Sequence, residues 1–157
     1  MLDVKRDDKI LEIGCGAGLA VQLIASKLES GIINAVDRSA AMIKLASKRN
    51  LEFIETGTAR FFTHELSEVR FDAHSFNKIF AFNVGVFLQD SKKEFDAIRS
   101  WLTTDGELYI FYQPPYEKTK QIAKQVRGHL RENNFSIVES IFKKLSPASA
   151  FCIVTKP

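Results

Sequence analysis

Cysteine, tryptophan and proline are scarce in this chain of 157 residues, which contains two, one and four of them. The two cysteines, Cys15 and Cys152, lie near opposite ends of the sequence, and neither has a partner at a short spacing. The sequence therefore indicates neither a disulfide framework nor a zinc site. We expect no bound metal and a reducing, cytoplasmic setting.

Long hydrophobic runs are also missing. The longest, from Ile79 to Leu88, is interrupted by Asn83 and is too short to span a bilayer. Residues 1–8 lack the apolar segment of a signal peptide. The formal net charge of +3 is too small to indicate nucleic-acid binding by itself. These absences favour a globular protein with no membrane partner, and they make a nucleic-acid partner a weak hypothesis.

One stretch, residues 9–18, organises the rest of the chain. An apolar run leads into glycines at positions 14, 16 and 18, and a helical pattern begins directly after them. Glycine permits positive φ and allows the backbone to come close to a ligand. The N–H groups of such a loop and of the following helix form a positive edge that is rich in donors. The stretch predicts a strand, a tight loop and a helix that bind a nucleotide-like ligand.

Hydrophobic periodicity predicts strands and helices in alternation along the chain. Ser39 is placed to cap a helix, and Ser91 with Glu94 has the form of a capping box. The segment 60–75 has no clear pattern, although a short helix near 65–69 is one interpretation. The expected strands are 9–13, 32–36, 51–55, 76–82, 107–112, 135–142 and 150–155, and the expected helices are 17–29, 39–49, 91–102 and 116–133.

Strands that alternate with helices indicate a mostly parallel sheet with helices on both faces. The last two strands have no helix between them, so they must pair antiparallel. We therefore predict an α/β fold, a three-layer doubly wound sheet of seven strands with a C-terminal antiparallel hairpin. It fills residues 1–157 as a single domain.

The glycine spacing separates two classes of nucleotide-binding site. In the dinucleotide pattern Gly-x-Gly-x-x-Gly, the third glycine position would be Leu19 here. The actual pattern is Gly14-x-Gly16-x-Gly18, preceded by Glu12. Asp37 follows about 20 residues later, at the end of the second strand, where a carboxylate can accept hydrogen bonds from both ribose hydroxyls. Asp37 also suits a helix start, and the two roles are compatible.

Residues 12–18 and the stretch Ala35-Val36-Asp37-Arg38-Ser39 resemble the class I S-adenosylmethionine-dependent methyltransferases. The resemblance covers nearly the whole chain and includes the final hairpin. It implies S-adenosylmethionine as the cofactor and S-adenosylhomocysteine as the product. It also implies a methyl acceptor, which we expect to be a small molecule.

The resemblance assigns parts of the cofactor to residues of this chain. The glycines would pass the methionine and ribose, Asp37 would hold the ribose, Arg38 and Met42 would lie near the adenine, and Asn83 near the methionine end. Thr58 stands where the family often has an acid, after the third strand, that holds the adenine amino group. Asn77 stands where an aspartate often opens the fourth strand. The expected cofactor-binding residues are Glu12, Gly14, Cys15, Gly16, Gly18, Asp37, Arg38, Met42, Gly57, Thr58, Ala59 and Asn83.

The acceptor is expected at the ends of the fourth and fifth strands, near Asn83, Gly85 and Phe87 and near residues 113–116. The sequence Gln113-Pro114-Pro115-Tyr116 resembles the Asn-Pro-Pro-Tyr motif of amino-methylating enzymes, but it follows the fifth strand rather than the fourth. Histidines 64, 74 and 129 are candidate bases by residue type alone. No catalytic residue is identified.

The favoured hypothesis is an S-adenosylmethionine-dependent methyltransferase that acts on a small molecule. Two alternatives stay open: a non-catalytic module that binds the cofactor or a partner, and a methyltransferase of protein or RNA. About eight residues precede the first strand, so the crevice would be open. That would fit a minimal enzyme, a homodimer whose partner subunit closes the site, or a chain that lacks an N-terminal segment.

Overall fold

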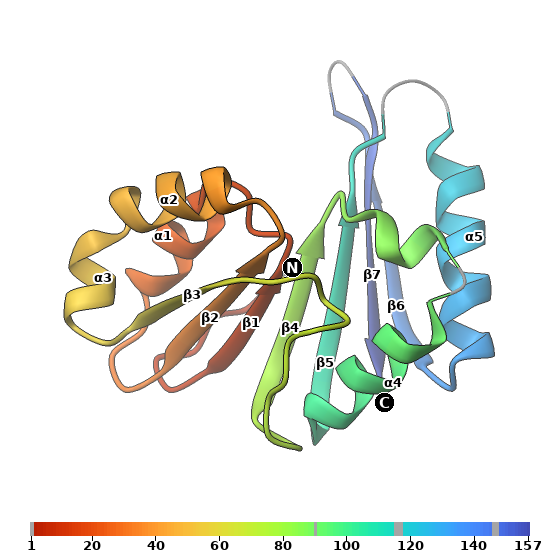
Figure 1. Cartoon of the computed structure of the whole chain (residues 1–157). Coiled ribbons are helices and arrows are strands. Elements are labelled where there is room, and N and C mark those ends of the chain that lie inside the picture. The colour runs from red at the N-terminus through yellow and green to blue at the C-terminus, as the bar shows by residue number, and fades with distance from the viewer. Residues whose placement is uncertain (1, 90, 115–117, 146–147) are drawn as a thin grey trace.

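The computed structural model describes residues 2–89, 91–114, 118–145 and 148–157. Most strands are followed by helices along the chain, and helices lie on both faces of a seven-stranded sheet (Figure 1). The strands are β1 Lys9–Ile13, β2 Ile32–Asp37, β3 Ala59–Thr63, β4 Phe76–Phe82, β5 Leu102–Tyr112, β6 Ser136–Lys143 and β7 Ala150–Lys156. The helices are α1 Leu19–Ala25, α2 Ala40–Arg49, α3 Leu51–Glu55, the short 3-10 helix η1 Gly85–Leu88, α4 Lys92–Trp101 and α5 Thr119–Glu132.

The strand order in the sheet is β3-β2-β1-β4-β5-β7-β6. Strands β1 to β5 are parallel, while β7 is antiparallel to both β5 and β6. The predicted fold is therefore confirmed, including the final hairpin. The strand order reverses between β1 and β4, and the carboxyl ends of strands at such a reversal form the binding crevice of open α/β sheets.

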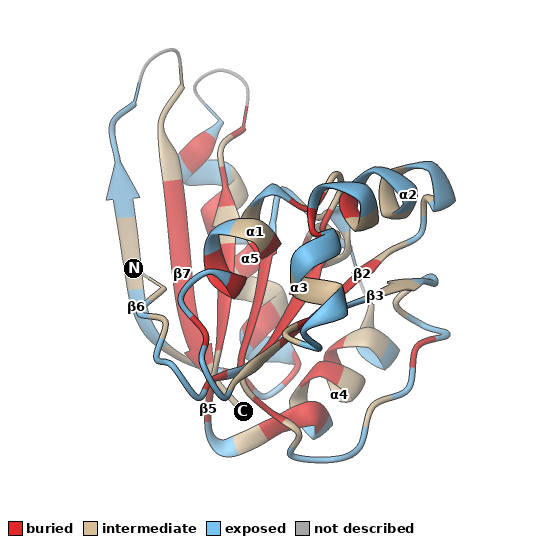
Figure 2. Ribbon diagram, turned by 90° about the vertical axis from the view of Figure 1, so that its left-hand side faces the viewer, coloured by how far each residue is buried: buried red, intermediate tan, exposed pale blue. Residues whose placement is uncertain are grey.

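Apolar side chains form one core on each face of the sheet. Helices α4 and α5 pack on one face, where Phe95, Ile98 and Leu130 are almost wholly buried. Helix α1 packs on the other face, through Val21 and Ile24. Figure 2 shows the buried residues running along the central strands and the inner sides of the helices. The two cores hold β1 and β4 rigid at the point where the crevice opens.

The prediction of a strand at 51–55 is wrong, because these residues form helix α3 and the third strand is Ala59–Thr63. Buried Asn50 ends α2 and begins α3. Its Nδ2 atom donates to the carbonyls of Gly18 and Ala46 at 3.0 and 2.9 Å, and its own carbonyl accepts from the N–H groups of Phe53 and Ile54. These bonds continue the helical chain through the segment that sequence alternation had suggested to be extended.

Smaller differences follow from tertiary contacts. Strand β5 begins at Leu102 rather than at the expected residue 107, and its added first part has an irregular register against β4. The interpretation of 65–69 as a helix is also wrong, since these residues form a turn. Ser91 precedes α4, but its side chain makes no capping hydrogen bond. Within the described residues, no helix is both long and apolar enough to cross a membrane.

A buried ion pair joins the amino ends of β1 and β4. The Asp8 carboxylate is fully buried and accepts hydrogen bonds from Lys78 Nζ at 2.6 Å, Asn77 Nδ2 at 2.6 Å and Lys5 N at 2.8 Å. Burial by itself raises the pKa of Asp8, but these donors outweigh it and the pKa is lowered overall. Asn77 therefore supports the Asp8 carboxylate at the amino edge, opposite the crevice.

We predict that Asp8→Asn lowers the free energy of unfolding by about 3–5 kcal/mol, because the charge of Lys78 stays buried without a carboxylate. The measurement is urea unfolding at neutral pH. Glu29→Gln breaks the exposed Arg6–Glu29 pair and should cost less than about 1 kcal/mol. Equal losses in the two variants would contradict the prediction. In wild type, the contribution of Asp8 is present above its unfolded pKa near 3.8 and is lost as pH falls through the lower folded pKa.

Candidate functional site

The three glycines between β1 and α1 serve different purposes. All have positive φ, of 71° at Gly14, 51° at Gly16 and 72° at Gly18. A Cβ on Gly14 would lie 2.6 Å from a methyl group of Val84, and one on Gly18 would lie 2.8 Å from Ala46 Cβ. A Cβ on Gly16 would meet no atom within 4 Å. Gly14 and Gly18 are thus required by packing, whereas Gly16 borders open space that a ligand can enter.

The loop is tied to the end of β2 by its own N–H groups. Gly14 N and Cys15 N both donate to the Val36 carbonyl, at 2.8 and 3.1 Å. Gly16 N donates to Asp37 Oδ2 at 2.8 Å. These donors are therefore used within the protein, contrary to the expectation that they face a ligand. The loop is held in shape before any ligand arrives.

Asp37 connects the loop, the start of α2 and the crevice. Its second oxygen, Oδ1, accepts from Ser39 N at 2.9 Å, while the Ser39 hydroxyl caps α2 by accepting from Met42 N at 3.3 Å. Each oxygen of an ionised carboxylate has two lone pairs. Asp37 is half-exposed at the crevice, so it can hold the loop and still accept hydrogen bonds from a ligand. The predicted capping role of Ser39 is confirmed.

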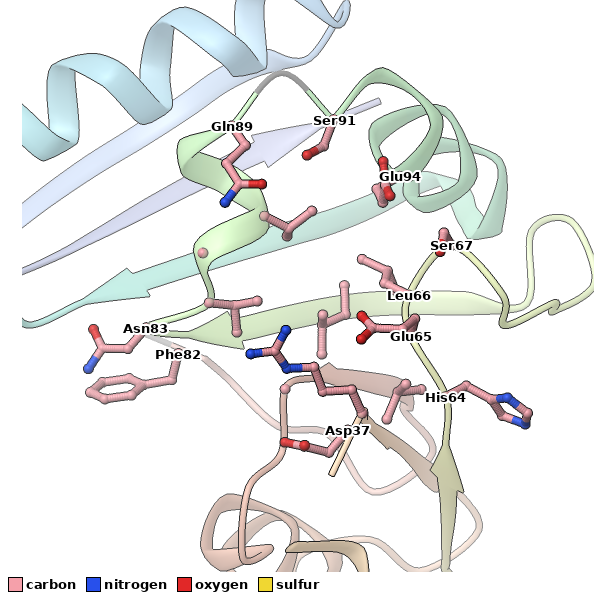
Figure 3. Close-up of a pocket in the computed structure, with 17 residues that line it drawn as sticks. Asp37, His64, Glu65, Leu66, Ser67, Phe82, Asn83, Gln89, Ser91 and Glu94 are labelled. Atoms are coloured by element: carbon pink, nitrogen blue, oxygen red, sulfur yellow. The ribbon is translucent and has the colours of Figure 1, made fainter. Parts of the chain in front are cut away.

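A cavity of about 490 Å³ lies at the carboxyl ends of β1 to β4, at the strand reversal. Figure 3 shows Asp37 on one side, Glu65 and Leu66 beside it, and Gln89, Ser91 and Glu94 across from them. Three carboxylates against one guanidinium make its lining acidic. The lining residues are Ile13, Gly14, Val36, Asp37, Arg38, His64, Glu65, Leu66, Ser67, Phe82, Asn83, Val84, Gly85, Val86, Gln89, Ser91 and Glu94.

Several of the predicted residues lie at this cavity and others lie behind it. Gly14, Asp37, Arg38, Asn83 and Gly85 line it, as does His64 among the histidines. Of the remaining predicted residues, Glu12, Cys15, Gly16, Gly18 and Met42 are outside the described lining of the cavity, in β1, the loop and α2.

Gly57, Thr58 and Ala59 were predicted as a loop that follows the third strand, and this placement is wrong. They precede or open β3, at the amino edge of the sheet, where the Thr58 carbonyl accepts from Ile33 N at 2.9 Å. The error follows from assigning the strand to the segment that forms α3. With β3 at Ala59–Thr63, the acid that follows the third strand is Glu65, and it lines the cavity. The adjacent aromatic residues Phe61 and Phe62, followed by Thr63, were the signal for this strand, because aromatic residues and threonine are enriched in strands.

Glu12 is buried behind the loop, and its Oε2 atom has no hydrogen-bond partner among the described residues. Burial, and secondly the charge of Asp37, raise the pKa of Glu12 to about 8. The neighbouring Cys15 is also buried, and burial is the main cause that raises the pKa of its thiol to about 12. Cys15 is therefore not a thiolate nucleophile at neutral pH.

Asn83 fastens the ends of β4 and β5 together. It has a positive φ of 55°, which asparagine tolerates better than most residues. Its N–H donates to the Phe111 carbonyl, and its Oδ1 accepts from Gln113 N, both at 2.9 Å. Asn83 therefore has a structural role at these strand ends, and it also lines the cavity. Phe87, expected on the acceptor side, is instead fully buried against Phe95.

The other candidate groups lie away from the cavity or outside the described residues. His74 Nδ1 is 2.9 Å from the Leu102 carbonyl at the amino edge, and His129 is 3.5 Å from Glu132 on α5. Pro115 and Tyr116 of the proline motif are outside the described residues.

Known proteins are similar to this chain in fold and in sequence. The family described as "Methyltransferase domain" matches residues 10–106, which contain the glycine loop, Asp37 and Glu65. This chain belongs to that family. It is an S-adenosylmethionine-dependent methyltransferase of class I. A crystal structure of an S-adenosylmethionine-dependent methyltransferase from Aquifex aeolicus superposes with a TM-score of 0.80 at 15% identity, over 98% of this chain and 84% of that one.

Two relatives are similar to this chain over very different lengths. The uncharacterized methyltransferase YdaC of Bacillus subtilis is 26% identical over 99% of this chain and 86% of its own length. A malonyl-[acyl-carrier protein] O-methyltransferase of Priestia megaterium is 51% identical, but over only 27% of this chain and 16% of its own length.

We predict that Gly16→Ala weakens cofactor binding, whereas Gly57→Ala does not. Both glycines have positive φ and open space around a Cβ, so each variant should lose about 1–2 kcal/mol of stability from backbone strain. Gly18→Ala should lose more, because its Cβ also collides with α2. Thermal unfolding and calorimetry with S-adenosylhomocysteine check these outcomes. The same affinity in the Gly16 and Gly57 variants would disprove the assignment.

Glu12→Gln should make stability less dependent on pH. Because the folded pKa of Glu12 is raised to about 8, its stabilising contribution is present below the unfolded pKa and is lost as pH rises toward 8. The variant should therefore become more stable than wild type, by up to about 4 kcal/mol, as pH rises from about 5 to 8. Urea unfolding across this range is the measurement, and the exposed Glu52→Gln should run parallel to wild type. If the stability of Glu12→Gln varied with pH in parallel with that of wild type, the pKa of Glu12 would be the same in the folded and unfolded states.

Proposed function

We propose that this methyltransferase transfers the methyl group to a small-molecule acceptor, and that the cavity at the strand reversal holds both cofactor and acceptor. The observation that carries the proposal is the continuity of this cavity. It runs from Asp37 at the end of β2 to Asn83, Gly85 and Gln89 beyond β4. A volume of about 490 Å³ falls within the range of about 300–1,000 Å³ that is usual for ligand sites.

The described residues fit S-adenosylmethionine at its ribose and adenine ends. Asp37 keeps acceptor capacity for the ribose hydroxyls, and the space beside Gly16 admits a ligand close to the backbone. We assign Glu65, rather than Thr58, as the residue that accepts a hydrogen bond from the adenine amino group of the cofactor. An ionised carboxylate forms a stronger hydrogen bond with that group than a hydroxyl does.

The charge of the cavity supports a sulfonium cofactor and a small acceptor. Asp37, Glu65 and Glu94 outnumber Arg38, so the lining attracts the positive sulfonium and repels phosphates. A polyanion with a phosphodiester backbone, such as RNA, is therefore a poor acceptor. Lys118, directly before α5, and Lys120 and Lys124 within it are exposed and lie outside the described lining of this cavity.

Methyl transfer needs alignment more than activation. The cofactor supplies an electrophilic methyl group on a good, neutral leaving group. The chain's task is to hold the acceptor's lone pair in line with that methyl carbon and to exclude competing water. Asn83 and Gln113 hold the ends of β4 and β5 at a fixed separation through a 2.9 Å hydrogen bond, which suits them to position an acceptor. The short match to the malonyl-[acyl-carrier protein] enzyme does not carry its acceptor over to this chain.

Calorimetry with S-adenosylmethionine and S-adenosylhomocysteine tests the proposal. Asp37→Asn keeps the shape of the side chain, and loss of its charge should weaken binding by about tenfold or more. Glu65→Gln should weaken the binding of adenosine-containing ligands by a similar factor. Asp105→Asn, an exposed change on β5, is the matched control and should bind as wild type.

Thermal unfolding must accompany these measurements, because Asp37 also holds the loop. A variant that binds poorly and unfolds at the wild-type temperature locates the loss in the ligand contact. Unchanged affinity in Asp37→Asn would overturn the ribose assignment. Salt-sensitive binding of RNA that displaces S-adenosylhomocysteine, with no turnover of small acceptors, would overturn the acceptor class.

A further inference from the structure

A second cavity, of about 320 Å³, lies at the opposite edge of the sheet. It is formed by residues of β1, β2 and β3 and by the chain that leads into β4. In Figure 1 this connection runs from the end of β3 down beside β4 without a helix to cover the strands. The lining residues are Lys9, Ile32, Asn34, Arg60, Phe62, Arg70, Phe71, Asp72, Ser75 and Phe76.

Asn34 is the feature of this cavity that most needs an explanation. It lies in the middle of β2, between Leu11 of β1 and Arg60 of β3 in the strand register, and only 8% of the residue is exposed. No described residue forms a hydrogen bond with its carboxamide, although it lines the cavity. Its nitrogen and oxygen are not among the described side-chain atoms that are closed off from solvent without a partner, so both can be reached from the cavity. This donor and acceptor are therefore available to a ligand.

The charge around the cavity is opposite to that of the cofactor site. Lys9, Arg60 and Arg70 have exposed side chains, and no described carboxylate lies within 4.0 Å of their charged nitrogens. Arg70 is held at the rim because its Nη1 donates to the carbonyls of Ser67 and Val69, both at 2.7 Å. Among the described lining residues, Asp72 is the single acidic one. Three cations beside one carboxylate favour an anionic group.

Aromatic side chains form the wall beside these charges. Phe71 packs edge to face against Phe62, Phe76 and Trp101, with ring centroids 5.5, 5.0 and 5.2 Å apart. Such contacts restrain the rings. A planar ring can lie against this wall while a linked anion reaches the cations.

We propose that this cavity binds a nucleoside monophosphate as a free small molecule. The phosphate lies among Lys9, Arg60 and Arg70, the base packs against Phe62 and Phe71, and the Asn34 carboxamide pairs with the edge of the base. A carboxamide has both a donor and an acceptor, as the edge of a base does. The volume is at the lower end of the usual range for ligand sites, about 300 Å³.

Calorimetry and NMR titration with AMP, GMP and UMP test the proposal, with S-adenosylhomocysteine present at saturation so that the cofactor site is occupied. At least one nucleotide should bind with a dissociation constant below about 1 mM, and adenosine or inorganic phosphate alone should bind about tenfold more weakly. Resonances of β3 and of residues 70–76 should shift. Displacement of the nucleotide by S-adenosylhomocysteine would place it in the cofactor cavity and overturn the proposal.

Three variants separate this site from its surroundings. Arg60→Gln should weaken binding of the nucleotide about tenfold without changing the affinity for S-adenosylhomocysteine. Arg131→Gln, an exposed change on α5, should change neither affinity. Asn34→Leu should weaken the nucleotide yet unfold at the wild-type temperature or above, because its amide has no described partner to lose. Destabilisation by Asn34→Leu, no binding by any of the three nucleotides, or much tighter binding of a 5′-phosphorylated oligonucleotide would each overturn the proposal.

Discussion

The hydrogen bonds from the glycine loop to the end of β2 are the constraint on which the cavity at the strand reversal depends. The N–H groups of Gly14, Cys15 and Gly16 hold the carbonyl of Val36 and the carboxylate of Asp37, so the loop after β1 and the end of β2 form one rigid unit. His64 N adds a bond from the end of β3 to the Asp37 carbonyl, at 3.2 Å. Three strand ends are thus fixed around the cavity before a ligand binds. Preorganisation of this kind lowers the entropy that binding must offset.

Local chemistry made the fold and the first half of the site predictable. Three glycines with positive φ, an acid at the end of β2 and two strands without a helix between them are features that neighbouring residues determine. The third strand was not predictable in the same way. Residues 51–55 have an apolar pattern that suits either conformation, and the deciding bonds come from buried Asn50, which contacts Gly18 from 32 residues away. Because the third strand was predicted at 51–55, Glu65 was not recognised as the acidic residue that follows this strand.

The far side of the cavity depends on tertiary structure that no spacing in the sequence reports. Glu94, Gln89 and Ser67 come from α4, the end of η1 and the β3–β4 connection, and they meet because the two cores fix those elements against the sheet. Phe87 is a second example of this limit, because it was expected at the cavity and lies elsewhere. It follows β4 closely enough to be expected at the acceptor, yet the 3-10 helix turns it into the core beside Phe95. Sequence position gives the neighbourhood of a side chain, while the direction it faces is decided by packing.

Strand β2 carries one key residue of each cavity, three positions apart. Asp37 faces an acidic cavity at the carboxyl edge, and Asn34 faces a basic one toward the amino edge. A sulfonium cation is attracted to the first cavity and repelled by the second, and a phosphate has the reverse preference. Opposite charge at the two edges would therefore keep the two proposed ligands apart, although each contains a ribose and a base. Discrimination of this kind comes from rejecting the wrong ligand as well as from binding the right one.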